Sequence, residues 1–386
     1  MRIAILTQAL RYNYGGILQN FALQTVLRRM GHDVVTLDPH RYNFTLWQHI
    51  ILILRHAFTR YIRGRRDVPI LAEWINDREH DKKTRLLGTN TFKFVDKHIK
   101  RKEYWDLTKD VKEGDYNVFV VGSDQTWRWE YNRGQCMTKL TNMFLDFTKG
   151  WNIKRIAYAA SFGTNEWEGD DEITKTCRDA IKDFDLVTVR ESSGVDICKR
   201  VFNVDAHHVL DPTLLLAQED YMKQVEKKED IETKEGDLYL CLLDENEENK
   251  QLANAISEEM GLKLYTYSSR ANDCHGVHSI EERIQPPVEL WLKGFEQAII
   301  ILTDSFHACV FSIIFRKQFY LYANKDRGME RYTSLFNMLG IKDRSIQSIE
   351  DVRNMKPIDY NAVYKRLKYC QDESFTLLGD ALNHKN

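Results

Sequence analysis

The sequence predicts an α/β fold of two Rossmann-like domains, each built on a parallel sheet, that face one another across a cleft. The chain has 386 residues, more than the roughly 250–300 at which a single hydrophobic core stops growing. Short apolar runs alternate with amphipathic runs in both halves, a rhythm typical of parallel sheets. Between the halves, at about residues 217–236, charged residues dominate, as in an exposed helix and linker. We therefore expect domains at 1–216 and 217–386.

Composition excludes several classes of protein. The 55 basic and 57 acidic side chains leave a net charge of -2, so no overall attraction to nucleic acid is expected. The seven cysteines form no C-x-x-C pair, which favours a reduced, cytoplasmic chain without structural zinc. The apolar run at residues 1–7 is too short for a signal-peptide core or a membrane span. No metal or cofactor is expected.

The chain opens with a β-α-β unit. Residues 2–7 read as a buried strand, 17–30 as an amphipathic helix and 33–37 as the next strand. The loop between the first strand and the helix ends in Gly15 and Gly16. Paired glycines let a backbone approach a ligand, let the helix and loop pack closely, or simply form a tight turn. They do not complete G-x-G-x-x-G, so no dinucleotide site is predicted.

Residues 44–100 depart from this rhythm and predict a helical insertion. Residues 46–58 are apolar and aromatic, and a cluster of arginines follows at positions 55, 60, 63, 65 and 66. A basic, aromatic, amphipathic stretch either lies against an anionic membrane surface or forms the solvated face of a helical hairpin. The first reading implies peripheral contact with the inner membrane surface.

The next strands of the first half each end in polar residues. The predicted strands are 116–121, 155–160, 186–189 and 209–210. The carboxyl ends of parallel strands meet at one edge of a sheet, where ligands bind. We therefore expect the residues that follow these strands to converge.

The second half repeats the pattern with strands at 238–243, 263–267, 299–302 and 318–322. After the third of these strands comes the turn 303–308, Thr-Asp-Ser-Phe-His-Ala, which leads into a helix. Its histidine either contacts a ligand or bonds a carbonyl within the turn, and Asp304 is expected to cap the helix.

Six motifs follow the predicted strands in order. They are Asn13-Tyr14-Gly15-Gly16 with Gln19, Gly122-Ser123-Asp124-Gln125 with Trp127, Tyr158 to Gly163, Val189-Arg190-Glu191, Asp211-Pro212-Thr213 and Thr303 to His307. Taken together, these motifs resemble the polysaccharide pyruvyl transferase family, and the resemblance runs from residue 2 to about 340, in the family's order. It implies a GT-B-like fold and the transfer of pyruvate from phosphoenolpyruvate onto a sugar, as a ketal, in surface polysaccharide, exopolysaccharide or capsule synthesis.

The resemblance also implies roles for single residues. Arg190 matches a position that contacts phosphoenolpyruvate, and His307 matches the histidine of the second-domain motif. Some members carry an arginine two residues before that histidine, where this chain has Ser305. Ser305 and His307 are expected to contact phosphoenolpyruvate, and Arg327 or Arg331 is expected to supply the cation. His307 suits a general acid, and Asp124 is expected to act as base or bind acceptor hydroxyls. The residues expected to bind the acceptor sugar are Asn13, Tyr14, Gly15, Gly16, Gln19, Ser123, Asp124, Gln125, Trp127 and Ser161.

Two other functions remain open at this point. A glycosyltransferase with this architecture would use a nucleotide sugar. It would require a nucleotide-binding carboxylate in the second domain, for which Glu330 is the candidate. A carbohydrate-binding subunit without turnover would use Trp127, Trp129, Trp151 and Trp167 for stacking on sugars. His207, His208, His275 and His278 lack partners at metal-ligand spacing and are expected to be surface histidines.

Overall fold

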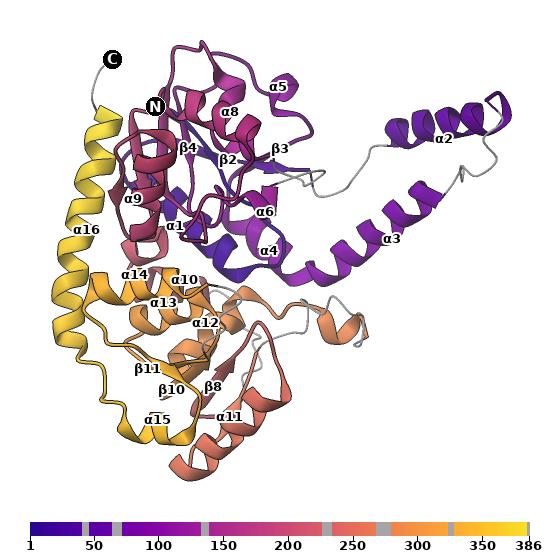
Figure 1. The fold of residues 1–386 in the computed structure, drawn as a ribbon. Helices are drawn as coiled ribbons and strands as arrows, with labels where there is room; N and C mark the ends of the chain where they lie inside the picture. The colour runs from indigo at the N-terminus through magenta and orange to yellow at the C-terminus, as the bar shows by residue number, and fades with distance from the viewer. Residues whose placement is uncertain are drawn as a thin grey trace.

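Two parallel β-sheets organise the chain (Figure 1). The structure is a computed structural model, and it describes residues 1–40, 46–63, 72–132, 139–225, 234–267, 279–322 and 328–383. The first sheet has the strand order β3-β2-β1-β4-β5-β6-β7, and the second has the order β12-β11-β10-β8-β9. All recorded strand pairs are parallel. The prediction of two parallel-sheet α/β domains is therefore confirmed.

The strands of the first sheet are short and mostly apolar because both faces of the sheet are covered by helices. Val118–Val121, for example, is buried at every position. The exceptions are the two edge strands, Arg101–Tyr104, which the sequence pattern does not predict, and His207–His208, which lies two residues before the predicted strand 209–210. The strands are β1 Arg2–Leu6, β2 Asp33–Pro39, β3 Arg101–Tyr104, β4 Val118–Val121, β5 Lys154–Ala160, β6 Leu186–Val189 and β7 His207–His208.

Helices connect the strands of the first sheet. The first begins at Tyr14, three residues before the predicted start, because the Asn13 side chain caps it and accepts a hydrogen bond from the Gly16 backbone N–H at 3.3 Å. The larger helices of this domain are α1 Tyr14–Arg29, α4 Thr89–His98, α8 Asp171–Ile181 and α9 Ser192–Ile197, with single turns at α5 Leu107–Asp110, α6 Trp129–Asn132 and α7 Leu140–Met143.

The second sheet lies beyond the charged stretch, and its first strand begins at Leu238. The boundary predicted between residues 216 and 217 thus falls between the two sheets. The strands are β8 Leu238–Cys241, β9 Leu264–Tyr265, β10 Ile300–Thr303, β11 Gln318–Tyr322 and β12 Ser345–Ile346. The helices are α10 Gln218–Val225, α11 Glu247–Met260, α12 Val288–Gln297, α13 Phe306–Ile314, α14 Glu330–Leu339, α15 Ile349–Asn354 and α16 Tyr360–Asn383.

The last helix, α16, links the two domains. It runs along one side of both in Figure 1. The Lys154 ammonium of β5 donates hydrogen bonds to the carbonyl oxygens of Ala381 and Leu382 near the helix end, at 2.7 and 3.1 Å. A helix assigned to the second domain by position therefore also covers the first sheet.

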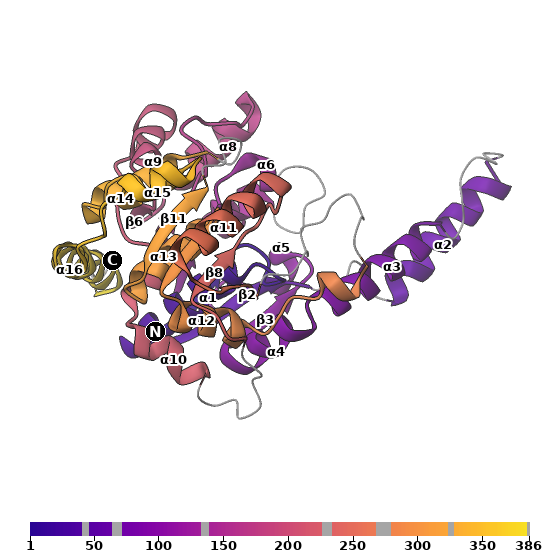
Figure 2. The same ribbon diagram turned by 90° about the horizontal axis from the view of Figure 1, so that it is seen from below.

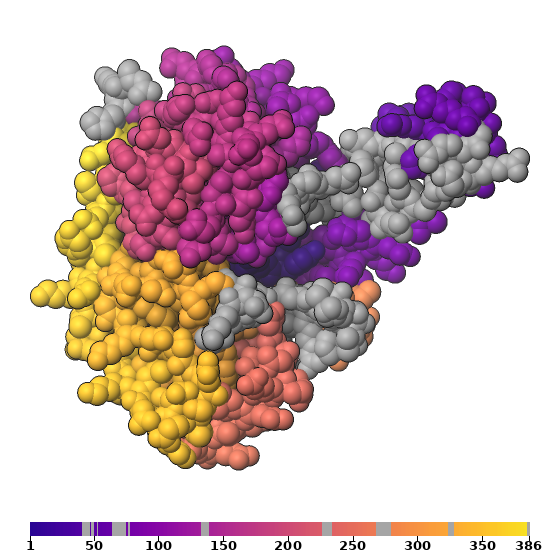
Figure 3. All heavy atoms as spheres, viewed as in Figure 1, coloured from indigo at the N-terminus to yellow at the C-terminus, as the bar shows by residue number. Residues whose placement is uncertain are grey.

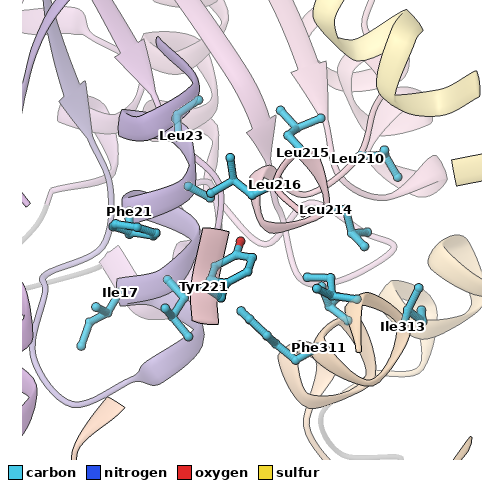
Figure 4. Close-up of a cluster of buried hydrophobic side chains, with 14 of the residues drawn as sticks. Ile17, Phe21, Leu23, Leu210, Leu214, Leu215, Leu216, Tyr221, Phe311 and Ile313 are labelled. Carbon is cyan, nitrogen blue, oxygen red and sulfur yellow. The ribbon is translucent and has the colours of Figure 1, made fainter. Parts of the chain in front are cut away.

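A shared hydrophobic core fixes the domains against each other (Figure 4). Tyr221 of α10 lies between Phe21 of α1 and Phe311 of α13. Its ring centre is 6.2 Å from that of Phe21 and 4.9 Å from that of Phe311. The Tyr221 hydroxyl donates to the Thr213 carbonyl at 2.8 Å, so it is buried without an unpaired polar group. This core holds the strand-end loops of both sheets face to face.

A helical hairpin projects from the first domain, where the sequence predicts a helical insertion. It consists of α2, Leu46–Tyr61, and α3, Ala72–Leu87. Both views in Figures 1 and 2 show it extending away from the two sheets. Within the described part of the chain, no helix is long and apolar enough to cross a membrane.

Candidate functional site

A cavity of about 600 Å³ lies between the domains, on the side where Figure 3 shows the surface hollowed. Strand-end loops of both sheets contribute to its wall, as expected for parallel sheets. We call it the interdomain cavity. Its lining residues are Gln8, Asn13, Asp124, Gln125, Arg128, Glu130 and Tyr131 from the first domain, and Leu243, Ser305, Phe306, His307, Arg331 and Tyr332 from the second.

The turn between β10 and α13 brings His307 to this cavity. The strand ends at Thr303 and the helix begins at Phe306, which confirms the predicted strand-to-helix turn. Ser305 caps the helix, accepting a hydrogen bond from the Ala308 N–H at 3.4 Å. His307 therefore sits in the first helical turn, where unpaired N–H groups favour an anion.

Asp304 does not cap α13, contrary to the prediction. Its carboxylate accepts hydrogen bonds from the backbone N–H groups of Leu243 and Asp244, at 2.7 and 2.8 Å. These residues follow β8, the neighbouring strand. Asp304 therefore connects the loops that follow β8 and β10, and the hydroxyl of Ser305 caps α13 instead.

The first turn of α1 packs directly against His307 across the domain boundary. A Cβ placed on Gly15 would lie 2.0 Å from the Nδ1 atom of His307, and one on Gly16 would lie 3.1 Å from a carboxylate oxygen of Asp124. These glycines are therefore required for close packing of the helix end against a histidine and a carboxylate, and their contact with an acceptor sugar stays a prediction. Asn13, their cap, also lines the cavity.

Asp124 holds an uncommon backbone conformation at the cavity wall. Its φ is 71°, in the left-handed region, where aspartate is among the few tolerated side chains. Its carboxylate accepts a hydrogen bond from the Gln125 N–H at 2.9 Å, and its carbonyl accepts one from the Ser161 N–H at 3.1 Å. The conformation turns the chain so that both Asp124 and Gln125 reach the cavity.

A buried ionic cluster lies behind His307. The Arg190 guanidinium donates to the Asp211 carboxylate at 2.8 Å and lies 3.4 Å from Glu191. The same Asp211 oxygen accepts from the Ser123 hydroxyl at 2.9 Å and lies 3.7 Å from Nε2 of His307. Ser161 donates to Glu191 at 2.5 Å. Two predicted acceptor-binding serines thus hold carboxylates of this cluster.

Asp211 and Arg190 of this cluster stabilise each other's charged forms. Burial alone would raise the pKa of the Asp211 carboxyl, but His307, Arg190 and Thr213 hold it below its ordinary value. Burial alone would lower the pKa of the Arg190 guanidinium, but Glu191 and Asp211 raise it. Asp211 therefore presents a negative charge to the His307 ring.

Arg190 is not among the described residues that line the cavity. It is only 4% exposed, and its guanidinium lies 4.5 Å from the centre of the Phe306 ring. Phe306 itself lines the cavity. In this conformation Arg190 is separated from the cavity by that ring, so its contact with a donor stays a prediction.

Two other arginines supply positive charge at the cavity wall. Arg331 was a predicted candidate, and its guanidinium lies 5.8 Å from the Phe306 ring centre. Burial lowers its pKa, and the charge of Arg190 acts in the same direction. Arg128 was missed by the sequence reasoning. It donates to the Gln125 side chain at 2.9 Å and lies over the Tyr131 ring at 4.7 Å.

Trp127 lies in the core of the first domain, which corrects the prediction that it binds a sugar. It is fully buried. Its indole N–H donates to the Met143 carbonyl at 2.9 Å, and its ring stacks on Phe144 at 4.8 Å. Trp151 and Trp167 also make ring contacts in this core. None of these rings is among the described residues that line the cavity.

Gln19 and Tyr14 support the site without lining it. Gln19 is fully buried and donates to Thr7 and to the Gly16 carbonyl at 2.8 and 2.9 Å. This corrects its prediction as a sugar ligand. Tyr14 donates to the Pro286 carbonyl at 2.7 Å and stacks on Trp291 of the second domain. Both residues fix the first turn of α1.

Three of the remaining predicted residues, Arg327, His275 and His278, lie outside the described residues. His208 is half-buried, and its Nε2 lies 3.0 Å from the Arg190 carbonyl oxygen. Among the described residues there is no group of three or more side chains arranged to hold a metal ion.

Comparisons with known proteins place this geometry in context. A family model described as polysaccharide pyruvyl transferase matches residues 13–326. A search of the curated proteins gave no match. Among solved structures, UGT89C1 of Arabidopsis thaliana complexed with UDP-L-rhamnose aligns with a TM-score of 0.53 at 9% identity, over 98% of this chain and 97% of that one. UDP-GlcNAc 2-epimerase of Neisseria meningitidis aligns with a TM-score of 0.49 at 8% identity, over 99% of each chain. The first likeness shows the GT-B fold.

Proposed function

This chain belongs to the polysaccharide pyruvyl transferase family, and we propose that it moves pyruvate from phosphoenolpyruvate onto a sugar of a surface polysaccharide or its lipid-linked precursor, as a ketal. The observation that carries the proposal is the composition of the interdomain cavity. It joins a histidine and two arginines with two carboxylates, Asp124 and Glu130, and amide side chains in one space. Such a set suits an anionic donor on one side and a hydroxyl-rich acceptor on the other.

The donor side of the proposed site is the second-domain wall with Arg128 opposite. Phosphoenolpyruvate carries a carboxylate and a phosphate, which require concentrated positive charge and helix N-termini. Arg331 and Arg128 provide the charge, and the first turn of α13 provides N–H groups beside Ser305. Arg128 thereby supplies the positive charge that some family members place at the position of Ser305. Arg190 keeps its predicted role only if Phe306 moves aside.

The acceptor side is the first-domain wall. Asp124, Asn13 and Gln125 line it, and carboxylate and amide groups are suitable partners for sugar hydroxyls. Asp124 is the proposed base. Its carboxylate lies beside the first turn of α1, where a Cβ on Gly16 would approach it to 3.1 Å. The same helical turn therefore contacts both Asp124 and His307.

The proposed reaction balances without water or a redox partner. One sugar hydroxyl adds to the central carbon of phosphoenolpyruvate while a proton is delivered to the methylene carbon, which becomes a methyl group. The second hydroxyl then replaces phosphate at the same carbon and closes the ketal. Of the two hydroxyl protons, one ends on the methyl group and the other on phosphate. His307, held against Asp211, is the proposed proton donor.

The two alternative functions receive less support. Glu330, the candidate nucleotide-binding carboxylate, is not among the described residues that line the cavity. Of the four tryptophans that a carbohydrate-binding subunit would use, Trp127 is fully buried, and none is among the described residues that line the cavity. A cytoplasmic location is proposed because the cysteines at 177, 198, 241, 309 and 370 are unpaired.

Ligand-induced stabilisation tests the donor directly. Thermal unfolding of the protein is followed with increasing phosphoenolpyruvate or UDP, since a ligand that binds only the folded state raises its stability by mass action. We expect phosphoenolpyruvate to raise Tm and UDP to leave it unchanged. The opposite result would assign the cavity to a nucleotide-sugar glycosyltransferase.

A further inference from the structure

Helix α2 carries an apolar stripe that nothing in the described part of the chain covers. Trp47, Ile51, Leu54 and Phe58 follow one another at spacings of four, three and four residues, so they lie on one face of the helix. They are 73%, 63%, 63% and 53% exposed. Tyr61, at the end of the helix, continues the stripe and is 73% exposed.

This exposure is unusual within the molecule. Helix α8 is also amphipathic, but it buries its apolar residues Cys177 and Ile181 against the first sheet. Soluble proteins rarely leave a contiguous apolar surface uncovered, and such a surface marks an interaction site. The stripe belongs to the hairpin that projects away from both sheets in Figures 1 and 2.

Charge narrows the choice of partner. The described α2 segment, residues 46–63, contains Arg55, Arg60 and Arg63 and no acidic residue, although the chain as a whole has a net charge of -2. Arg55 and Arg63 are exposed. Arg63 lies 5.9 Å from the centre of the Phe58 ring, so positive charge borders the apolar stripe.

An apolar stripe with tryptophan and tyrosine, bordered by arginines, matches the boundary between acyl chains and anionic headgroups. A second copy of this helix would instead bring arginines of like charge together. No helix of the described chain is able to span a bilayer, which agrees with a helix that lies in the surface plane.

We propose that α2 docks this protein onto an anionic phospholipid surface, with the stripe Trp47, Ile51, Leu54, Phe58 and Tyr61 inserted and the arginines on the headgroups. This inference goes beyond the proposed reaction and does not depend on it. It would give the interdomain cavity access to acceptors carried on membrane lipids.

Vesicle sedimentation with the full chain tests the proposal. We expect the protein to pellet with vesicles of phosphatidylglycerol and phosphatidylcholine and to stay in solution with phosphatidylcholine alone. Replacing Leu54→Glu together with Phe58→Glu is expected to abolish binding. Replacing Arg55→Gln together with Arg63→Gln is expected to weaken it about tenfold, since each surface arginine contributes to attraction by anionic lipid.

The matched control is Ile299→Glu, which changes an apolar residue that is 55% exposed on the second domain and is expected to leave binding unchanged. Equal binding to both vesicle types, or no binding to either, would overturn the proposal. So would a wild-type dimer that the Leu54→Glu and Phe58→Glu changes convert to a monomer, because it would assign the stripe to a second copy. Stabilisation by phosphoenolpyruvate is measured without vesicles, so the two proposals fail independently.

Discussion

Gly15 and His307 belong to different domains, yet no side chain fits between them, since a Cβ on Gly15 would lie 2.0 Å from Nδ1 of the His307 ring. On its other side, Nε2 of His307 lies 3.7 Å from the Asp211 carboxylate. The ring is therefore held between a helix N-terminus and a buried negative charge, both from the first domain. The candidate site exists because the domains meet.

Gly15→Ala should displace His307 and leave the fold intact. The added methyl group requires the ring to move, and a misplacement of about 1 Å costs about 100-fold in rate. Steady-state phosphate release from phosphoenolpyruvate measures the effect. Gly379→Ala in α16 is the control, because a Cβ there meets nothing within 4 Å. Equal rates for the two variants would show that His307 has no required position.

Asp211→Asn should weaken both the fold and the reaction. The substitution removes the negative charge that faces Arg190 and His307, and breaking a buried ion pair costs about 3 kcal/mol or more. Urea unfolding measures the stability. Asp205→Asn is the control, because Asp205 pairs with Lys199 at the surface and is 90% exposed, where pairs contribute about 1 kcal/mol or less.

The stability that Asp211 contributes should depend on pH in a defined direction. The pKa of Asp211 is lowered in the folded protein, so its contribution is fully present above the unfolded-state pKa, about 4, and is lost as pH falls through the lower folded-state pKa. The difference in unfolding free energy between wild type and Asp211→Asn should therefore shrink as pH falls below about 4. A difference that grows as pH falls below about 4 would contradict the ionised state of Asp211.

Arg331→Gln should weaken phosphoenolpyruvate binding about tenfold or more, since hydrogen bonds to charged groups contribute about 1.5–3 kcal/mol. The Kd is measured by isothermal titration. Arg353→Gln serves as the comparison, because Arg353 pairs with Glu259 and Glu350 at the surface and is not among the described residues that line the cavity. An unchanged Kd for Arg331→Gln would remove Arg331 from the donor site.

Trp127→Ala should act on stability and leave sugar affinity unchanged. Removing a buried tryptophan costs about 3–5 kcal/mol, whereas Trp105, which is 38% exposed, should tolerate the same change at smaller cost. Unfolding curves give the stability, and the acceptor KM at a temperature where the variant is folded gives the affinity. A raised KM with unchanged stability would restore Trp127 as a sugar ligand.

The sequence predicted those parts of the fold in which apolar runs form buried strands. Apolar runs such as 116–121 became central strands, and the turn after Thr303 became a strand-to-helix turn. Strand β3 was missed because an edge strand with the sequence Arg-Lys-Glu-Tyr has no apolar signal. Its pairing with β2 comes from backbone hydrogen bonds, which composition does not reveal.

The site was predictable by position along the chain and less so by side-chain direction. Asp124, Ser305 and His307 follow strands and reach the cavity as expected. Trp127 and Arg128 are neighbours on one short segment, yet Trp127 points into the core and Arg128 into the cavity. The residue pattern does not encode these opposite directions. Arg128 would have been found by extending the Gly-Ser-Asp-Gln motif by three residues.

The most direct test of the account is transfer itself, measured as phosphate released from phosphoenolpyruvate in the presence of a panel of glycoside acceptors, with the pyruvylated product identified by mass. We expect the wild-type protein to release one phosphate for each ketal formed. His307→Ala should lower the rate at least about 100-fold, the usual contribution of a general acid, while its unfolding curve stays close to wild type. Turnover by His307→Ala at the wild-type rate would contradict the central claim that His307, held between Gly15 and Asp211, delivers the proton.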